Sequence, residues 1–211
     1  MNPESGPAAG GARTYPEPAE SHAPTAQTRT LRKVVAVGLG ALAVALAAQV
    51  TVPVPFSPVP MTLQPLAVLA VGGLLGGAAG TGALVLYLAM GIAGLPVFAG
   101  GAAGGVHLVG PTGGYLLAFP VAAGVTGALA RSVLTGSGGL NAGGVLRVLL
   151  ACAVGMVIIH VGGVAQLALL GGNPSLALRV GFVPFLTGDL LKVGLAAALI
   201  LAAGPKIRSL L

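Results

Sequence analysis

Between Val34 and Gly204 the chain carries only one carboxylate side chain, Asp189, and this scarcity of charge constrains its fold more than any other feature. Charged residues make up 7% of the sequence and hydrophobic residues 55%, whereas soluble domains contain about 25% charged residues. So few charges cannot cover a water-soluble surface, so lipid must solvate most of the outer face. The sequence therefore predicts an all-α integral membrane domain over residues 31–211. Residues 1–30, rich in Pro, Ala, Gly, Ser and Thr, are expected to form a disordered tail.

The hydrophobic body divides at Pro- or Gly-rich breaks into about six apolar stretches, and a bilayer core requires roughly 20 such residues per helix. We expect a compact bundle of six transmembrane helices, in which abundant Gly and Ala allow close packing in lipid. The expected helices are 34–51, 62–77, 79–95, 113–130, 146–170 and 182–203. The second and third meet at Gly76 and Gly77, which predicts a tight turn or a tilted hairpin. The longer breaks, Val52–Met61 and Leu95–Thr112, are expected to be non-helical.

The basic residues near the helix ends predict the orientation in the cell membrane. With six crossings, Arg179 lies on one side of the membrane. The basic residues that flank the other helix ends lie on the opposite side: Arg29, Arg32, Lys33, Arg131, Arg147, Lys206 and Arg208. We therefore expect both termini to be cytoplasmic. A competing interpretation of the first stretch is a cleavable secretory signal ending near Ala45-Leu46-Ala47. A retained helix is favoured because cleavage would leave an odd number of helices.

The last helix places Asp189 and Lys192 three residues apart, and therefore on neighbouring positions of one helical face. An isolated charge in the middle of a membrane costs roughly 2.5–3.5 kcal/mol on insertion scales. The two side chains must therefore be compensated by each other, by a polar cavity or by a bound ligand. A plain ion pair that fixes helix packing remains the alternative, but intramembrane ionisable residues usually mark function.

A second polar segment reads GPTGGYLLAF over residues 110–119. Thr112, Gly113 and Gly114 could present a hydroxyl and backbone amides to a ligand at a helix N-terminus, with Tyr115 nearby. A helix cap followed by an interfacial tyrosine is an equally good interpretation. The segment is no phosphate loop, and the chain contains no Walker motif, so it has no ATPase of its own.

The other polar groups are isolated. His107 lies in the outer loop from Phe98 to Val109, and His160 interrupts an apolar helix, where an interhelical hydrogen bond is the usual role. Gln64 could satisfy backbone groups freed by the adjacent prolines. These residues form neither a metal site nor a Ser-His-Asp set, so we expect no metal, no cofactor and no catalysis.

Small residues repeat along the first helix. Ala41 with Ala45, and Ala43 with Ala47, have the small-xxx-small spacing that allows helices to approach closely. In an Ala-rich helix such spacings also arise by chance, but a flat face of small residues could dock a partner helix.

Four segments in this order resemble the BioY family of biotin transporters: VPVPFSPVPMTLQ, LYLAMGIAGLPVFAGG, GPTGGYLLAF and PFLTGDLLK. Members of that family are the substrate-specificity components of energy-coupling factor transporters. The resemblance covers roughly residues 34–205 and implies a six-helix protein with an outward-facing, high-affinity biotin pocket. It implies pocket roles for Asp189, Lys192 and Thr112 to Tyr115. We add Gln64, Phe98, His107 and His160 as weaker candidates for the same pocket. It also implies partners, namely a membrane coupling subunit and two ATPases.

The chemistry of biotin suits the charged pair. A ureido ring offers two N–H donors and one carbonyl acceptor, which a carboxylate and an ammonium would complement. No obvious basic anchor exists for the biotin carboxylate, because the outer loop offers only His107 and backbone amides.

Other functions remain open on these patterns. The same architecture could bind thiamin or riboflavin, although no Trp, three Tyr and five Phe provide little stacking surface for a flavin. An intramembrane enzyme, a passive channel and a membrane assembly factor are further alternatives.

Overall fold

The computed structural model describes residues 26–134 and 141–211, and most of these are helical. The main helices are α1 (Ala26–Gln49), α2 (Gln64–Leu75), α3 (Gly77–Ile92), α5 (Gly113–Leu134), α6 (Ala142–Gly171) and α8 (Leu186–Leu210). The short elements are β1 (Thr51–Val52), β2 (Met61–Thr62), η1 (Ala99–Gly101), α4 (Val106–Val109), α7 (Pro174–Gly181) and η2 (Val183–Phe185). Each of the six predicted stretches therefore overlaps one main helix.

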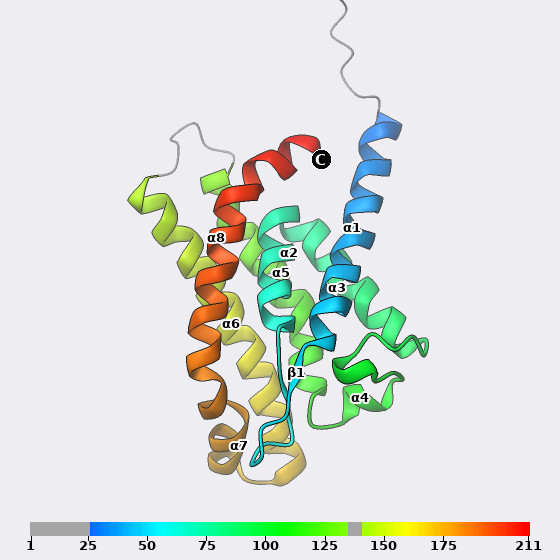
Figure 1. Cartoon of the computed structure of the whole chain (residues 1–211), viewed down its shortest axis with the longest axis vertical. Helices are drawn as coiled ribbons and strands as arrows, with labels where there is room; N and C mark the ends of the chain where they lie inside the picture. The colour runs from blue at the N-terminus through cyan, green and yellow to red at the C-terminus, as the bar shows by residue number, and fades with distance from the viewer. Residues whose placement is uncertain (1–25, 135–140) are drawn as a thin grey trace, which may run out of the picture.

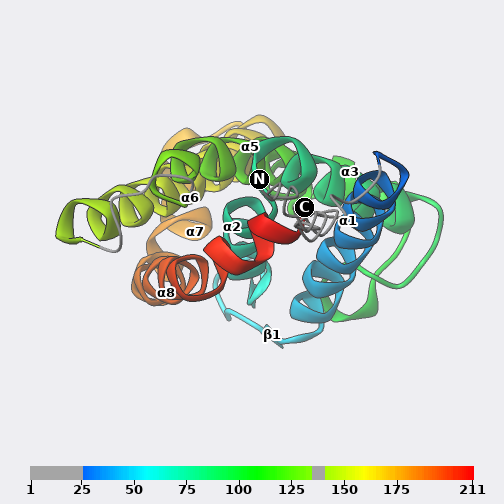
Figure 2. The same cartoon turned by 90° about the horizontal axis from the view of Figure 1, so that it is seen from above.

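The helices run roughly along one axis, and the start of α1 and the C-terminus lie at the same end (Figure 1). We call this the terminal end. The opposite end, which carries the β1–β2 connection, α4 and α7, is the loop end. α2 lies near the middle of the bundle when it is viewed along the axis (Figure 2), and it contacts α1, α3, α5 and α8. The loop end is thus closed by irregular segments, whereas among the described residues the terminal end is formed mainly by ends of helices.

The helices differ in length. Three of them, α1, α5 and α6, are long and apolar enough to cross a membrane, as is the combined span Pro174–Leu210. The 12 residues of α2 and the 16 of α3 reach only about 18 and 24 Å at 1.5 Å per residue. The structure therefore combines four full-length spans with two shorter apolar helices.

Glycine packs these helices closely, as the composition predicts. A Cβ at Gly72 of α2 would clash with the backbone of Ala123 in α5, and one at Gly127 of α5 would clash with the carbonyl of Gly72. Gly76 joins α2 to α3 with a φ of +89°, a conformation that favours glycine. The predicted tight turn is confirmed.

Three sequence predictions need correction. α1 begins at Ala26, so the helix includes the last five residues assigned to the tail, because its polar first turns lie outside an apolar window. Residues 1–25 lie outside the described residues.

The break Leu95–Thr112 is not wholly irregular, since it contains η1 and α4, and α7 was not predicted. The break Val52–Met61 is free of helix, and β1 and β2 pair antiparallel at its ends.

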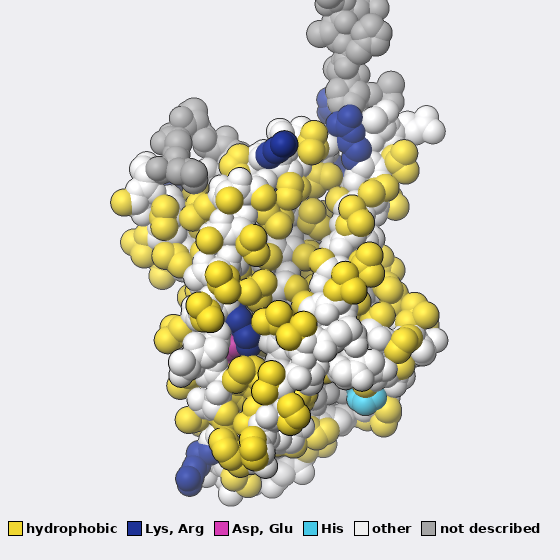
Figure 3. All heavy atoms as spheres, in the orientation of Figure 1, with side chains coloured by type: hydrophobic (Ala, Val, Ile, Leu, Met, Phe, Trp, Pro, Cys, Tyr) yellow, Lys and Arg dark blue, Asp and Glu magenta, His cyan; other side chains and the backbone are white. Residues whose placement is uncertain are grey.

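Hydrophobic side chains are spread over the face of the molecule seen in Figure 3, between its two ends. Large aliphatic residues on the outer faces of α1, α6 and α8 are exposed, among them Leu42, Val161 and Leu190. In water this surface would strongly favour aggregation, whereas in lipid it is the expected covering. The protein is a multi-pass membrane protein.

Candidate ligand-binding site

A cavity of about 230 Å³ is lined by residues of α2, α5, α6 and α8 and of the irregular segments at the loop end. Its apolar walls include Phe98, Phe119, Ile159 and Phe185. Its polar lining residues are Thr62, Gln64, His107, Thr112, Tyr115, His160, Asp189 and Lys192. Apolar walls with a few convergent polar groups are typical of small-molecule sites, and this volume suits a small ligand.

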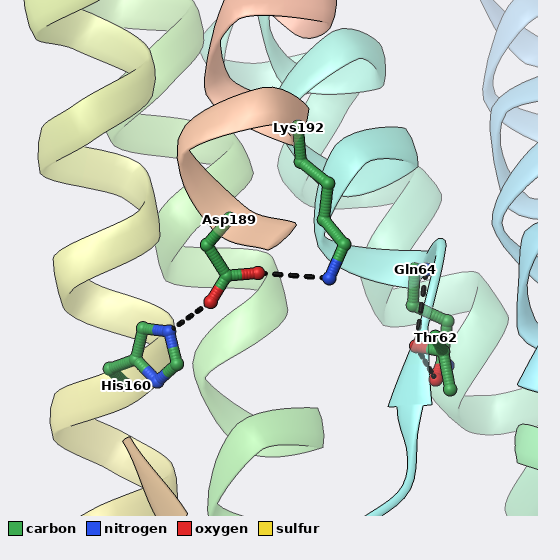
Figure 4. Close-up of polar contacts among 5 residues, drawn as sticks. All are labelled: Thr62, Gln64, His160, Asp189 and Lys192. Atoms are coloured by element: carbon green, nitrogen blue, oxygen red, sulfur yellow. Dashed lines mark hydrogen bonds and ion pairs between the residues drawn. The ribbon is translucent and has the colours of Figure 1, made fainter. Parts of the chain in front are cut away.

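Three charged or titratable side chains meet at one wall, and we call His160, Asp189 and Lys192 the charged cluster. Lys192 Nζ donates to Asp189 Oδ1 at 2.9 Å, and His160 Nε2 lies 2.6 Å from Asp189 Oδ2 (Figure 4). Their relative exposures are 8%, 6% and 6%. Both carboxylate oxygens therefore have a partner, which buried charge requires. The predicted meeting of Asp189 and Lys192 is confirmed.

Local structure explains why α8 can hold this carboxylate. Asp189 lies in the first turn of α8, where the positive end of the helix dipole stabilises negative charge. An ionised carboxylate only accepts hydrogen bonds, so His160 must carry its proton on Nε2 to bond it. His160 Nδ1 is buried without a partner among the described residues. The ring itself is held edge-on by Phe182, with centroids 4.9 Å apart, and by Tyr115 at 6.1 Å.

A second hydrogen-bonded group faces the charged cluster across the cavity (Figure 4). Gln64 Nε2 donates to Tyr87 Oη at 2.6 Å, and Thr62 Oγ1 donates to Gln64 Oε1 at 3.1 Å. The prediction that the Gln64 side chain satisfies freed backbone groups is therefore wrong. Thr62 takes that role, because its hydroxyl accepts from the backbone N–H of Gln64 at 3.2 Å.

The predicted Thr112–Tyr115 turn divides into two parts. Thr112 and Tyr115 line the cavity, whereas Gly113 and Gly114 do not. Side chains at those glycines would clash with the carbonyls of Leu108 and Gly162, so both positions serve close packing.

Tyr115 is a buried residue rather than the interfacial one that the sequence suggested. Its side chain is 8% exposed, and its hydroxyl donates to the carbonyl of Gly181 at 2.5 Å. The ring packs so closely on Gly163 that any side chain there would clash with it. Tyr115 thereby joins α5 to α6 and to the end of α7.

The weaker candidates Gln64, Phe98, His107 and His160 all line the cavity. Sequence reasoning missed Thr62, Phe119, Ile159 and Phe185. It also missed the bond between His160 and Asp189, for which one signal existed: a buried histidine needs a partner, and the body contains a single carboxylate.

Of the four alanines predicted to form a partner face on α1, two are buried and two are at least partly exposed. Ala41 and Ala45 are 0% and 6% exposed, because that side of α1 packs inside the protein. They cannot contact a partner in this arrangement, so that part of the prediction is wrong. Ala43 is exposed and Ala47 partly so.

Comparison with known proteins identifies the family of this chain. The model of the BioY family matches residues 20–209. The chain belongs to the BioY family. It is 39% identical over 148 residues to the biotin transporter BioY of Thermotoga maritima, covering 70% of this chain and 82% of that protein. It is 38% identical over 170 residues to a probable biotin transporter BioY of Pyrococcus horikoshii, covering 79% and 93%.

The fold is also similar to a solved structure. A crystal structure of the S-component for biotin from an ECF-type ABC transporter matches with a TM-score of 0.73 and 26% sequence identity. The match covers 89% of this chain and 95% of that one.

Proposed function

We propose that this protein binds biotin with high affinity and takes it up across the cell membrane as the S component of an energy-coupling factor transporter. The observation that carries the proposal is the buried carboxylate and ammonium of α8 in a small cavity of a BioY-family chain. Intramembrane charges that line a cavity usually mark a substrate site.

The charged cluster has hydrogen-bond donors and acceptors left for a ureido ring. Lys192 Nζ has three N–H donors and uses one on Asp189. Among the described residues, each oxygen of Asp189 accepts one hydrogen bond and has a second lone pair free. Asp189 can therefore accept from the ring N–H groups while Lys192 donates to the ring carbonyl. His160 holds the carboxylate in place and leaves those lone pairs accessible.

Uptake needs an energy source that this chain does not supply, since its sequence has no Walker motif. The proposal therefore includes a membrane coupling subunit and two ATPase subunits as partners. On α1, Ala43 is exposed and Ala47 partly exposed, so these two residues are the part of the small-residue pattern that remains accessible to such partners. Transport rather than catalysis is proposed, with biotin as cargo and no cofactor.

The proposed topology has six transmembrane helices and both termini in the cytoplasm. Four helices long enough to span, two shorter ones and the basic terminal end support it. Cysteine labelling tests this, because the native Cys152 is buried. A membrane-impermeant maleimide applied to intact cells should label Ser175→Cys in α7 and not Ser209→Cys in α8, and the reverse pattern would invert the topology.

Uptake of labelled biotin by biotin-auxotrophic cells tests the function. Cells that express the protein with a coupling subunit and ATPases should accumulate biotin, and excess unlabelled biotin should compete while thiamin and riboflavin do not. Competition by another vitamin would change the substrate, and product formation from biotin by the purified protein would indicate an enzyme.

A further inference from the structure

The basic side chains that line the cavity differ in whether they already have a hydrogen-bond or ion-pair partner. Three basic side chains line it: His107, His160 and Lys192. His160 and Lys192 are both bonded to Asp189. Among residues 26–134 and 141–211, the imidazole of His107 contacts another ring but has no hydrogen-bond or ion-pair partner. One cavity-lining basic group is therefore left for a ligand.

His107 is held firmly although it lies in a helix of only four residues. Its ring stands edge-on to Phe98, with centroids 6.0 Å apart and planes at 67°. Phe98 is 2% exposed, packs against Tyr87 with centroids 5.6 Å apart, and leaves no room for a side chain at Gly91. His107 therefore rests on a fixed aromatic support, as a recognition group requires.

The backbone around His107 is also fixed. Gln166 of α6 donates through Nε2 to the carbonyls of Leu108 and Gly110, at 3.0 and 2.6 Å. Thr112 Oγ1 makes a long contact of 3.5 Å with the carbonyl of His107 itself. α4 is thus tied to both α6 and the start of α5.

The two basic regions of the cavity come from different sides of the bundle. α4, which carries His107, lies across the molecule from α8, which carries Asp189 and Lys192 (Figure 1). A ligand that contacts both must be elongated, with a donor–acceptor ring at one end and a second polar group at the other. Biotin has this form, since a chain of methylene groups separates its ureido ring from its carboxylate.

We propose that His107 binds the carboxylate of the ligand tail and so makes the protein select biotin over neutral-tail analogues. This rests on the proposed biotin function. The apolar lining between the two ends, including Leu116 and Phe119, suits the methylene chain. An N–H donor facing a carboxylate forms a charge-assisted bond, which is roughly twice as strong as a neutral one.

Equilibrium binding of biotin and biotinamide to the purified full chain in detergent tests the assignment. The two ligands share the ureido ring and differ at the tail. The wild type should bind biotin about tenfold more tightly than biotinamide. His107→Phe, which keeps a ring on Phe98 but has no N–H, should bind both ligands equally, at the wild-type affinity for biotinamide. His107→Gln, which keeps a donor, should recover part of the preference.

Val109→Ala is the matched control, because Val109 lies on the same short helix and is exposed outside the cavity. It should bind like the wild type. A wild type without preference, or a His107→Phe variant that retains it, would overturn the assignment while leaving biotin binding intact. An equal loss of both ligands in His107→Phe would also overturn it. A wild type that binds neither ligand would overturn the proposed function itself.

Discussion

The loop end and the terminal end of this protein both hold charged side chains among apolar helices, but they satisfy them differently. At the loop end, the charged cluster is bonded only through side chains, beside a cavity. At the terminal end, Arg208 donates through Nη2 to the backbone carbonyls of Gly73 and Gly127, at 2.7 and 3.1 Å. Gly73 lies in the last turn of α2, where carbonyls lack helical partners.

This difference in hydrogen bonding indicates two roles: ligand binding for the charged cluster and structural support for Arg208. Arg208 completes the hydrogen bonding at the end of α2 and joins α8 to α2 and α5. The charged cluster leaves donors and lone pairs unused, and a cavity lets a ligand reach them. A charge bonded to backbone groups is expected to affect stability alone, whereas the charged cluster is expected to affect ligand affinity.

The largest effect is expected from Asp189→Asn. The substitution keeps the shape but removes the negative charge that pairs with Lys192 and bonds His160. Loss of a charged hydrogen bond costs about 1.5–3 kcal/mol, so biotin affinity should fall more than tenfold in equilibrium binding. Lys192→Met should weaken binding similarly. Lys206→Met, which removes an exposed charge at the terminal end, should not. Unchanged affinity in Asp189→Asn would contradict the site.

At Gly72, which does not line the cavity, we expect a substitution to lower stability and to leave biotin affinity unchanged. Gly72→Ala places a methyl group against the backbone of Ala123, and such overpacking costs about 1–3 kcal/mol. The thermal denaturation midpoint in detergent should fall, while the folded fraction binds biotin normally. Gly194→Ala is the control, since its methyl would meet nothing within 4 Å. Equal stability of the two variants would show that α2 and α5 are not closely packed.

His160→Phe should have a smaller effect on binding. The new ring can keep the packing against Phe182, but Asp189 loses one of its two partners. We expect affinity for biotin to fall by about 1–2 kcal/mol, less than in Asp189→Asn. Val161→Ala, at an exposed position on the same helix, should bind like the wild type. A loss as large as that of Asp189→Asn would make His160 a direct ligand.

The smallest effect is expected from Arg208→Gln. The shorter side chain cannot reach both carbonyls, and we expect a loss of about 1 kcal/mol of stability because the arginine is only partly buried. Biotin affinity should not change. Lys206→Gln, two residues earlier and exposed, should leave both properties intact. Reduced biotin affinity in Arg208→Gln would show that the two ends are coupled.

The sequence predicted the parts of the fold that depend on local pattern. Apolar runs located the six main helices, and the spacing of Asp189 and Lys192 predicted their contact. The bond from His160 to Asp189 joins residues 29 positions apart on different helices, so no local period could predict it. The inward face of α1 was equally hidden, because a helix that is apolar all round does not show whether Ala41 or Ala43 faces the core.

Short elements were missed for a related reason. Eight residues form α7 and four form α4, lengths at which helix periodicity cannot be recognised. These elements complete the loop end, and α4 brings His107 to the cavity. The part of the site that comes from long helices could thus be predicted better than the part that comes from short ones.

The location of bound biotin in an experimental structure of the complex tests the central claim most directly. The account predicts the ureido ring in the cavity, within about 3.2 Å of both an Asp189 carboxylate oxygen and Lys192 Nζ. The molecule has a second depression, a groove between α5 and α6 that is lined by Gly114, Gly162 and Gln166. This groove is the alternative location for biotin. Biotin bound in that groove, with the charged cluster unchanged and out of contact, would contradict the account.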